Sequence, residues 1–519
     1  RWVGPPAGPL AGVLDKVVPI LVLAALLTHP TQVTLRQWAR ALSGAVGFGR
    51  GLTARIPAGH VTVSDFLLVA AFLLWAFLAW RRGRARQALR LYPLGVAALL
   101  ACAVLSTLTP LESSAAATSR SYNAFLALGR FARVATIFVC GLGVLADYLS
   151  RQAWRDRLMA AFFVAAALCV AIGLVEYLQL RPPSPQAGRA GAIMSPMDVD
   201  AMFGFEGVAP GPHTGIGASS SRNVLGAWLT MVLPLAWAVF LFGRRPAVRG
   251  VCCALSVAGG LLLLSGGLWA AALLAVLALS FVRGRRAFVA TAVGMLALYG
   301  IVFSFAPQRH GHVLLDSVLL HKRADRFRTL PPRPCHLPLA PGGKGAASPD
   351  PWQQKFVQWQ PALLAFASRP FFGFGIGNYE GNVGAFYSRP THPDYNPAGS
   401  YNMDWPPGGI LMEKDATPFY AAWLVETGLV GLLGFAWMVM GFLRRAAHTL
   451  PRRHAGDDLA RALKLGAIAA LGAVCLGGLF TDYWVRGVGT ALTVVLALCA
   501  AELPEQEEIF PASEEVTRI

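Results

Sequence analysis

Long apolar runs separated by short basic clusters are the feature that most constrains this chain. A helix needs roughly 20 residues to cross about 30 Å of hydrocarbon, so runs near this length predict membrane-spanning helices. We expect about twelve such helices, since the apolar runs lie near 11–28, 63–80, 91–109, 126–148, 158–180, 223–242, 251–265, 267–282, 287–306, 418–442, 463–480 and 487–501. The sequence therefore predicts an all-α fold, a polytopic membrane helix bundle.

The composition agrees with a chain that resides in lipid. Of its 519 residues, 55% are apolar and 14% are charged, which lies outside the range usual for soluble proteins. The net charge of +18 is of the size found in nucleic-acid-binding proteins. However, most basic residues fall between apolar runs, as expected for loops retained on the cytoplasmic side, so we do not expect nucleic acid as a partner.

The basic clusters also predict the orientation. They follow the second, fourth, sixth, eighth and tenth predicted helices, at 81–90, 151–157, 244–249, 283–286 and 444–453. By the positive-inside rule, both termini are cytoplasmic and the segments 29–62, 181–222 and 307–417 lie outside.

Four parts are expected along the chain. Residues 1–306 form helices one to nine, 307–417 form a large extracytoplasmic loop domain, 418–501 form helices ten to twelve, and 502–519 are an acidic cytoplasmic tail. The loop is far longer than a connector needs, which is typical of functional loops. We expect it to be helical around 314–330 and 352–368.

Metal and cofactor sites are not predicted. Cys335 lies in a polar segment, whereas the other cysteines lie in apolar runs, so neither a disulfide framework nor a CxxC site follows. His310, His312 and His321 lack metal-ligand spacing.

Charged residues in the predicted outer part of the chain are the candidate substrate-binding groups. Arg326 and Arg328 in the long loop are either a solvated surface or a phosphate-binding cluster, because guanidinium groups form bidentate bonds with phosphates. Arg130 and Arg133 share one helix face. There they either bind a ligand, extend their guanidinium groups to the membrane interface, or form structural pairs with other residues. Glu426, inside the tenth helix, is either a structural hydrogen-bonding group or a catalytic one.

Several segments together resemble a known family. Residues 369–379 read RPFFGFGIGNY, 424–433 read LVETGLVGLL, and 217–226 read GASSSRNVLG at the start of the sixth helix. Residues 264–269 read LSGGLW between two helices. The order of these segments and the predicted topology resemble the O-antigen ligase and O-antigen polymerase superfamily of bacterial membrane glycosyltransferases.

The resemblance implies a function. Members of this family transfer a saccharide from a polyprenyl diphosphate carrier to an acceptor on the outer face of the cytoplasmic membrane, in cell-surface polysaccharide biosynthesis. It implies a polyprenyl-diphosphate-linked saccharide and membrane lipid as partners, and no cofactor. Proteins of envelope assembly are further candidate partners.

Three positions depart from the family pattern. Thr417 and Pro418 stand where ligases usually have a His-Asn pair, Gly266 replaces an arginine, and Thr214 stands where an arginine is common. A divergent active site would use other groups. Its candidate bases are Asp415, Glu413 and His213, and its candidate phosphate-binding residues are Arg222, Arg326, Arg328 and Arg389.

Three hypotheses therefore remain open. The first is a glycosyltransferase that ligates or polymerises a lipid-linked saccharide. The second is a non-catalytic relative that scaffolds a membrane assembly or binds a glycolipid, which the three departures favour. The third is a solute or ion transporter, which predicts broken helices and polar groups at the bilayer midplane.

Overall fold

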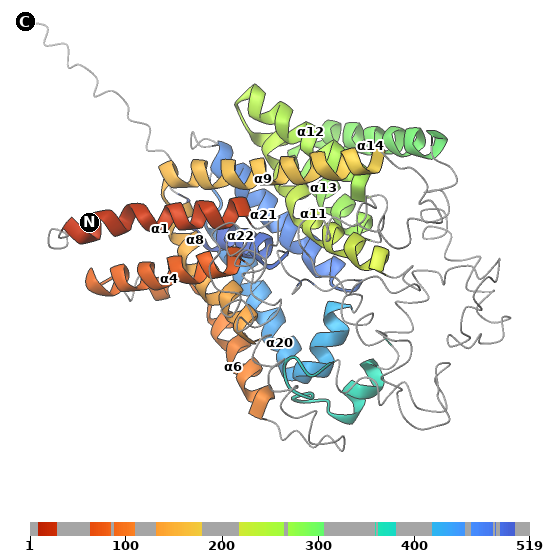
Figure 1. The fold of residues 1–519 in the computed structure, drawn as a ribbon. Helices are drawn as coiled ribbons and strands as arrows, with labels where there is room; N and C mark the ends of the chain where they lie inside the picture. Colours follow the sequence, from red (N-terminus) through yellow and green to blue (C-terminus); the bar gives the residue numbers. More distant parts are fainter. Residues whose placement is uncertain are drawn as a thin grey trace, which may run out of the picture.

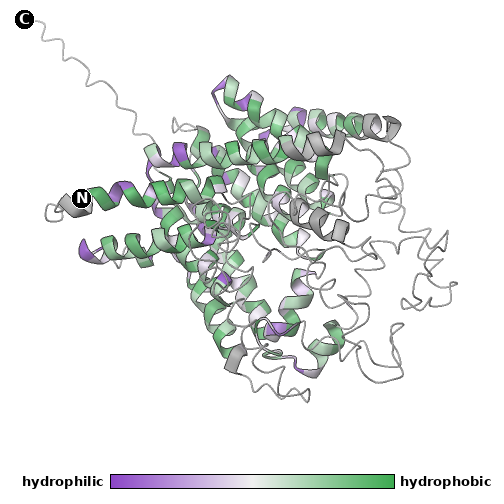
Figure 2. Ribbon diagram, in the orientation of Figure 1, coloured by the Kyte–Doolittle hydropathy of each residue, from purple (hydrophilic) through white to green (hydrophobic). Residues whose placement is uncertain are grey.

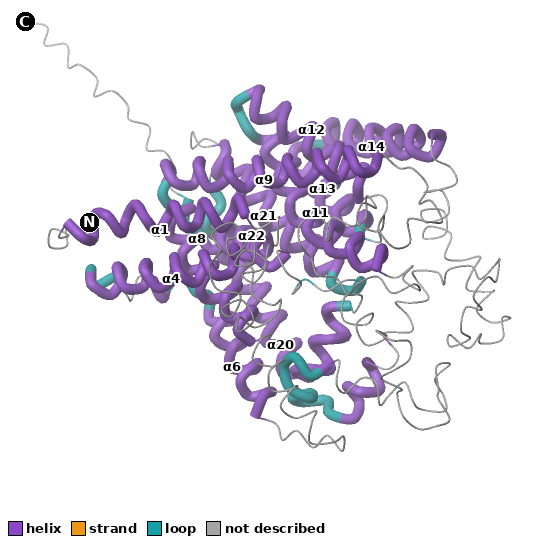
Figure 3. Tube along the Cα trace, viewed as in Figure 1, coloured by secondary structure: helices purple, strands orange, loops and turns teal. Residues whose placement is uncertain are grey.

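A computed structural model describes residues 9–28, 63–84, 88–108, 131–178, 217–263, 268–305, 359, 362–379, 418–451, 458–480, 483 and 488–503. Every regular element in these ranges is a helix (Figures 1 and 3). The all-α prediction is confirmed for these ranges.

The helices overlap all the apolar runs that predicted them. Their bounds are α1 Pro9–Thr28, α4 Val63–Arg81, α6 Leu94–Leu108, η2 Thr136–Gly141, α8 Leu142–Leu149, α9 Gln152–Leu178, α11 Gly217–Phe242, α12 Pro246–Leu263, α13 Trp269–Arg283, α14 Arg285–Phe305, α20 Phe419–His448, α21 Asp458–Gly477 and α22 Val488–Ala500. Five helices of the described part are long and apolar enough to cross a membrane: Val63–Arg81, Phe131–Leu149, Pro246–Leu263, Phe419–His448 and Leu459–Gly477. The chain is a helical membrane protein, and the count of about twelve spans stays a prediction.

The outer surface of the helices is apolar, as a lipid environment requires. Leu73, Trp80, Leu94 and Leu296 each expose more than half of their surface, from 62% to 72%. Figure 2 shows apolar residues along the helices and several hydrophilic residues at helix ends. Exposing apolar side chains to water costs free energy, whereas contact with the hydrocarbon of a membrane does not.

Several basic clusters lie in the end turns of helices rather than in loops. Arg155 and Arg157 belong to α9, Arg249 belongs to α12, and Arg444 and Arg445 belong to α20. Because α20 runs to His448, it extends beyond the predicted end at residue 442. The apolar run ends sooner than the helix does, since hydropathy reports lipid contact and not backbone hydrogen bonding.

Close helix contacts depend on small residues. A Cβ atom at Gly95 of α6 would clash with the backbone of Met438 in α20, and one at Gly466 of α21 would lie 2.9 Å from the Cα atom of Leu235 in α11. Helices in membranes gain attraction from such close backbone approach, because lipid supplies little hydrophobic drive between them.

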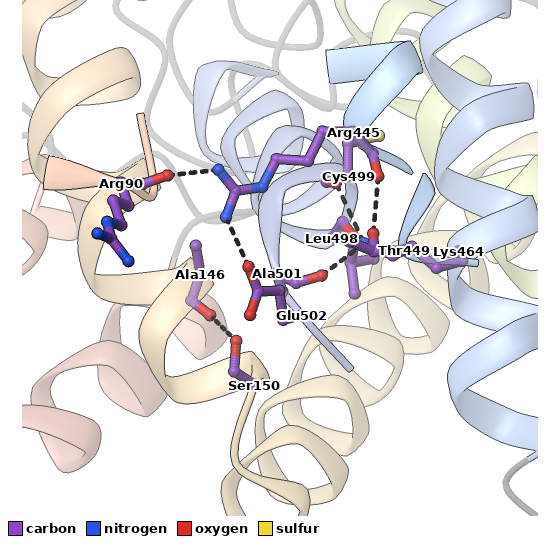
Figure 4. Close-up of polar contacts among 10 residues, drawn as sticks. All are labelled: Arg90, Ala146, Ser150, Arg445, Thr449, Lys464, Leu498, Cys499, Ala501 and Glu502. Carbon is purple, nitrogen blue, oxygen red and sulfur yellow. Dashed lines mark hydrogen bonds and ion pairs between the residues drawn. The ribbon is translucent and has the colours of Figure 1, made fainter. Parts of the chain in front are cut away.

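A buried lysine holds one end of the bundle together. Lys464 of α21 is fully buried, and its Nζ donates hydrogen bonds to the carbonyl oxygens of Leu498 (2.9 Å), Cys499 (3.1 Å) and Ala501 at the end of α22 (Figure 4). The last carbonyls of a helix lack partners within the helix and carry its negative dipole end, so a cation is favourable there.

Arg445 of α20 contacts two further segments at the same end. It donates one hydrogen bond to the carbonyl of Arg90 and another, of 3.4 Å, to the carboxylate of Glu502 (Figure 4). Thus the end of α20, the start of α21, the end of α22 and the residues before α6 meet in one polar region. The positive-inside rule places the same four ends on one side of the membrane.

A π-helical turn interrupts the helix at 131–149. Residues Thr136–Gly141 form this turn, and the hydroxyl of Tyr92 donates a hydrogen bond of 2.8 Å to the carbonyl of Val139 within it. Tyr92 therefore satisfies a backbone group at the point where the regular α-helical ladder changes.

Candidate functional site

The helix α20 is broken near its first third. Gly428 has φ 66° and ψ −163°, which is not helical, so the residues up to Thr427 and those from Leu429 form two half-helices. In Figure 1 the helix turns sharply beside the teal segment at the lower edge of the molecule. The predicted tenth span at 418–442 therefore contains a break that the sequence analysis did not predict. Hydropathy does not reveal the break, because the residues on both sides of the triplet 426–428 are mostly apolar.

The segment 369–379 fills the break. The amides of Phe374 and Gly375 donate to the carbonyls of Val425 (2.8 Å) and Glu426 (2.9 Å). In return, the amides of Leu429 and Val430 donate to the carbonyls of Pro370 (2.8 Å) and Phe371 (3.2 Å). We call these two segments, 370–375 and 425–430, the junction. Its hydrogen bonds satisfy groups that a broken helix would otherwise leave unpaired in a membrane protein.

Two glycines make the junction possible. Gly373 has φ 65°, and a Cβ there would clash with the carbonyl of Val425; a Cβ at Gly428 would clash with the carbonyl of Phe371. Both positions therefore combine a left-handed backbone with a close approach of another backbone, which glycine alone tolerates well.

Buried polar side chains surround the junction. Glu426, Thr427 and Asn378 are at most 2% exposed. The Thr427 hydroxyl donates to the carbonyl of Trp423 (2.7 Å), and the Asn378 amide donates to the carbonyl of Phe374 (3.3 Å). Polar groups inside a membrane protein are costly to bury, so their concentration at one place marks a candidate functional site.

The end of α6 adds a third segment to this site. Ser106 is fully buried, and its carbonyl would lie 3.0 Å from a Cβ atom at Gly375. One turn earlier, the Cys102 thiol approaches the carbonyl of Val430 at 3.7 Å. Residues from three distant parts of the sequence therefore meet around the break.

The site is anchored to α21 by aromatic residues. The Tyr420 hydroxyl donates to the carbonyl of Cys475 (2.7 Å), and the Trp359 indole donates to the carbonyl of Leu479 (3.3 Å). A small apolar cluster joins Ala362, Ala365 and Tyr379 to Ala421, Ala422 and Val425. Part of the predicted 307–417 loop, residues 359 and 362–379, therefore packs on α20, and residues 362–368 are helical as expected for 352–368.

A buried tyrosine lies just beyond α21. Tyr483 is 2% exposed, and its hydroxyl lies 3.3 Å from the Thr230 hydroxyl of α11. Burial raises the pKa of Tyr483, so the phenol stays neutral at physiological pH and acts as a hydrogen-bonding group.

The described ranges include few of the predicted site residues. Glu426 is buried at the junction, and Arg133 is half-buried at the start of the helix Phe131–Leu149. The backbone of Arg222 lies in α11. The remaining candidates, like the 314–330 segment, lie outside the described residues; they are Arg130, His213, Arg326, Arg328, Arg389, Glu413 and Asp415.

Sequence reasoning missed several residues of the site, namely Ser106, Asn378 and Thr427, as well as the break at Gly428. The signal available was the triplet Glu426-Thr427-Gly428, which is polar or flexible within an apolar run.

Among the residues with described side chains, no group of three or more His, Cys, Asp and Glu lies together in a way that would hold a metal ion.

Comparisons with known proteins add no relative. Neither the protein-family models nor the curated proteins gave a match to this sequence.

Proposed function

We propose that the chain is a membrane glycosyltransferase that transfers or polymerises a polyprenyl-diphosphate-linked saccharide on the outer face of the cytoplasmic membrane. One observation carries the proposal. Two of the segments on which the resemblance to O-antigen ligases and polymerases rests, 369–379 and 424–433, are far apart in sequence but bind each other through backbone hydrogen bonds. Their joint occurrence therefore has a structural reason, and they surround buried polar groups.

The proposed reaction needs three kinds of group. An acceptor hydroxyl attacks the anomeric carbon, the bond from that carbon to the diphosphate oxygen breaks, and the hydroxyl proton passes to a base. Arg326, Arg328 and Arg389, with Arg130, Arg133 and Arg222, are the candidates that stabilise the departing diphosphate. Asp415, Glu413 and His213 are the candidate bases.

A reconstituted assay tests this proposal. The purified chain in proteoliposomes should consume a lipid-linked oligosaccharide without any nucleotide sugar. Arg326→Ala or Arg328→Ala should lower kcat about 100-fold, as expected when one group that stabilises transition-state charge is lost. Arg84→Ala, at the basic end of α4, is the matched control and should keep full activity. If folded protein turns over no member of a broad panel of lipid-linked glycans, the enzyme proposal fails.

Glu426 has a separate test. If Glu426 serves structurally, Glu426→Gln keeps a hydrogen-bonding group of the same shape, and both activity and thermal stability should stay near the parent values. If its carboxylate takes part in the reaction, the same substitution should lower kcat while stability is kept. The two roles are therefore distinguished by measuring turnover and unfolding on one protein.

A non-catalytic, glycolipid-binding or scaffolding role is the second candidate. The observation that favours it is the replacement of the usual His-Asn pair by Thr417 and Pro418, together with Gly266 and Thr214. On this proposal the protein binds the lipid-linked saccharide in the same preparation without consuming it. A binding measurement run beside the turnover assay separates the two functions.

A further inference from the structure

The ends of α11, α12, α13 and α14 carry a basic surface. It consists of five exposed arginines: Arg245, Arg249, Arg283, Arg285 and Arg286. No ion pair within the described part of the chain involves any of the five. We call them the α11–α14 basic surface.

Two arginines elsewhere in the bundle have carboxylate partners within the protein. Arg82 pairs with Asp15, with one hydrogen bond of 2.9 Å, and Arg151 pairs with Asp147 at 2.8 Å. The hydrogen bond to Asp15 raises the pKa of Arg82. Their charge is neutralised within the protein, whereas no carboxylate in the described part of the chain pairs with the α11–α14 basic surface.

The sequence explains the difference. Residues 207–315, which include α11 to α14 and their connections, contain no aspartate and no glutamate. These four helices can therefore offer no carboxylate to the arginines at their ends.

Aromatic side chains position two of these arginines instead. The Arg249 guanidinium lies 5.7 Å from the centre of the Phe240 ring, and its Nε donates to the Phe240 carbonyl at 2.9 Å. The Arg283 guanidinium lies 5.5 Å from the centre of the Phe242 ring. Contact with a ring holds a guanidinium in place without cancelling its charge. Both cations are thus gathered around the last turn of α11.

Exposed apolar residues adjoin the charges. Val251 is 57% exposed, Phe281 63% and Val289 56%. A surface that combines cations with exposed apolar side chains at helix ends matches both parts of a phospholipid, the headgroup and the first methylenes of its chains.

We propose that the α11–α14 basic surface binds the phosphates of anionic phospholipid headgroups in the adjoining leaflet. Charge complementarity supports this binding: the five cations have no carboxylate partner among the described residues, and the phosphate of a lipid accepts bidentate bonds from guanidinium groups. This binding is independent of glycosyl transfer.

Native mass spectrometry of the purified full chain tests the proposal. Phosphatidylglycerol should bind more tightly than phosphatidylcholine. Because each basic residue near an anionic lipid surface contributes about fivefold in affinity, Arg283→Gln/Arg285→Gln/Arg286→Gln should weaken phosphatidylglycerol binding by roughly 100-fold. Binding of phosphatidylcholine should not change. The double variant Arg245→Gln/Arg249→Gln, on the neighbouring helix ends, should show a smaller loss in the same direction.

A charge-matched control decides whether the effect is local. The variant Arg81→Gln/Arg84→Gln/Arg90→Gln removes the same charge from exposed arginines near the ends of α4 and α6, and should keep the preference. Equal loss in this control would mean that net charge alone attracts the lipid, and the proposal would be overturned. It would also be overturned if the parent protein bound both lipids equally, or if both basic-surface variants kept the preference.

Discussion

At the scale of single residues, the position of Gly428 admits glycine alone without strain. Its positive φ and the carbonyl of Phe371 both exclude a side chain. Gly428→Ala should lower the free energy of unfolding by about 2 kcal/mol or more, because a non-glycine residue held in a sparsely populated backbone region costs 1–3 kcal/mol and the overlap adds to it. Denaturant titration in mixed micelles measures the change.

The control for Gly428 is another helical glycine. A Cβ at Gly472 of α21 would have no atom within 4 Å and its φ is not positive, so Gly472→Ala should be neutral or slightly stabilising. If both alanine variants behaved alike, the break at Gly428 would not be the strained position that the geometry indicates.

At the scale of helices, the end of α22 depends on a residue of α21. Lys464→Met keeps most of the side-chain volume but leaves the carbonyls of Leu498, Cys499 and Ala501 without their donor. Hydrogen bonds to charged groups contribute about 1.5–3 kcal/mol each, and we expect a loss of about 3 kcal/mol after the lysine's own burial cost is offset. A thermal unfolding curve of the detergent-solubilised protein measures it.

Lys16 provides the comparison for Lys464. Its side chain is exposed on α1, so Lys16→Met should leave unfolding almost unchanged. A drop of similar size in the two variants would argue against the capping role of Lys464.

At the scale of the whole molecule, the orientation in the membrane is the prediction on which the proposed chemistry depends. Cys335 lies in the predicted outer loop, and the other cysteines lie in apolar runs. A membrane-impermeant maleimide added to intact cells should therefore label the chain at Cys335. The Cys335→Ser variant should lose the label, and labelling that appears only after permeabilisation would place the loop in the cytosol.

The sequence alone determined the class of protein and the positions of its helices. Apolar runs must be shielded by lipid, so hydropathy located the ends of α4, α12 and α20 to within six residues. It also pointed to Glu426 and to the segment 369–379, which meet at the junction.

Only the tertiary structure decided how these pieces meet. Whether Gly428 continues a helix or breaks it depends on whether residues 370–375 are available to satisfy the freed backbone groups. The sequence also did not predict the partners of Lys464, because the carbonyls that it binds belong to another helix about 35 residues later. Local sequence determines which helices can form. Backbone hydrogen bonds between distant segments leave no pattern of side chains in the sequence, so the sequence does not predict them.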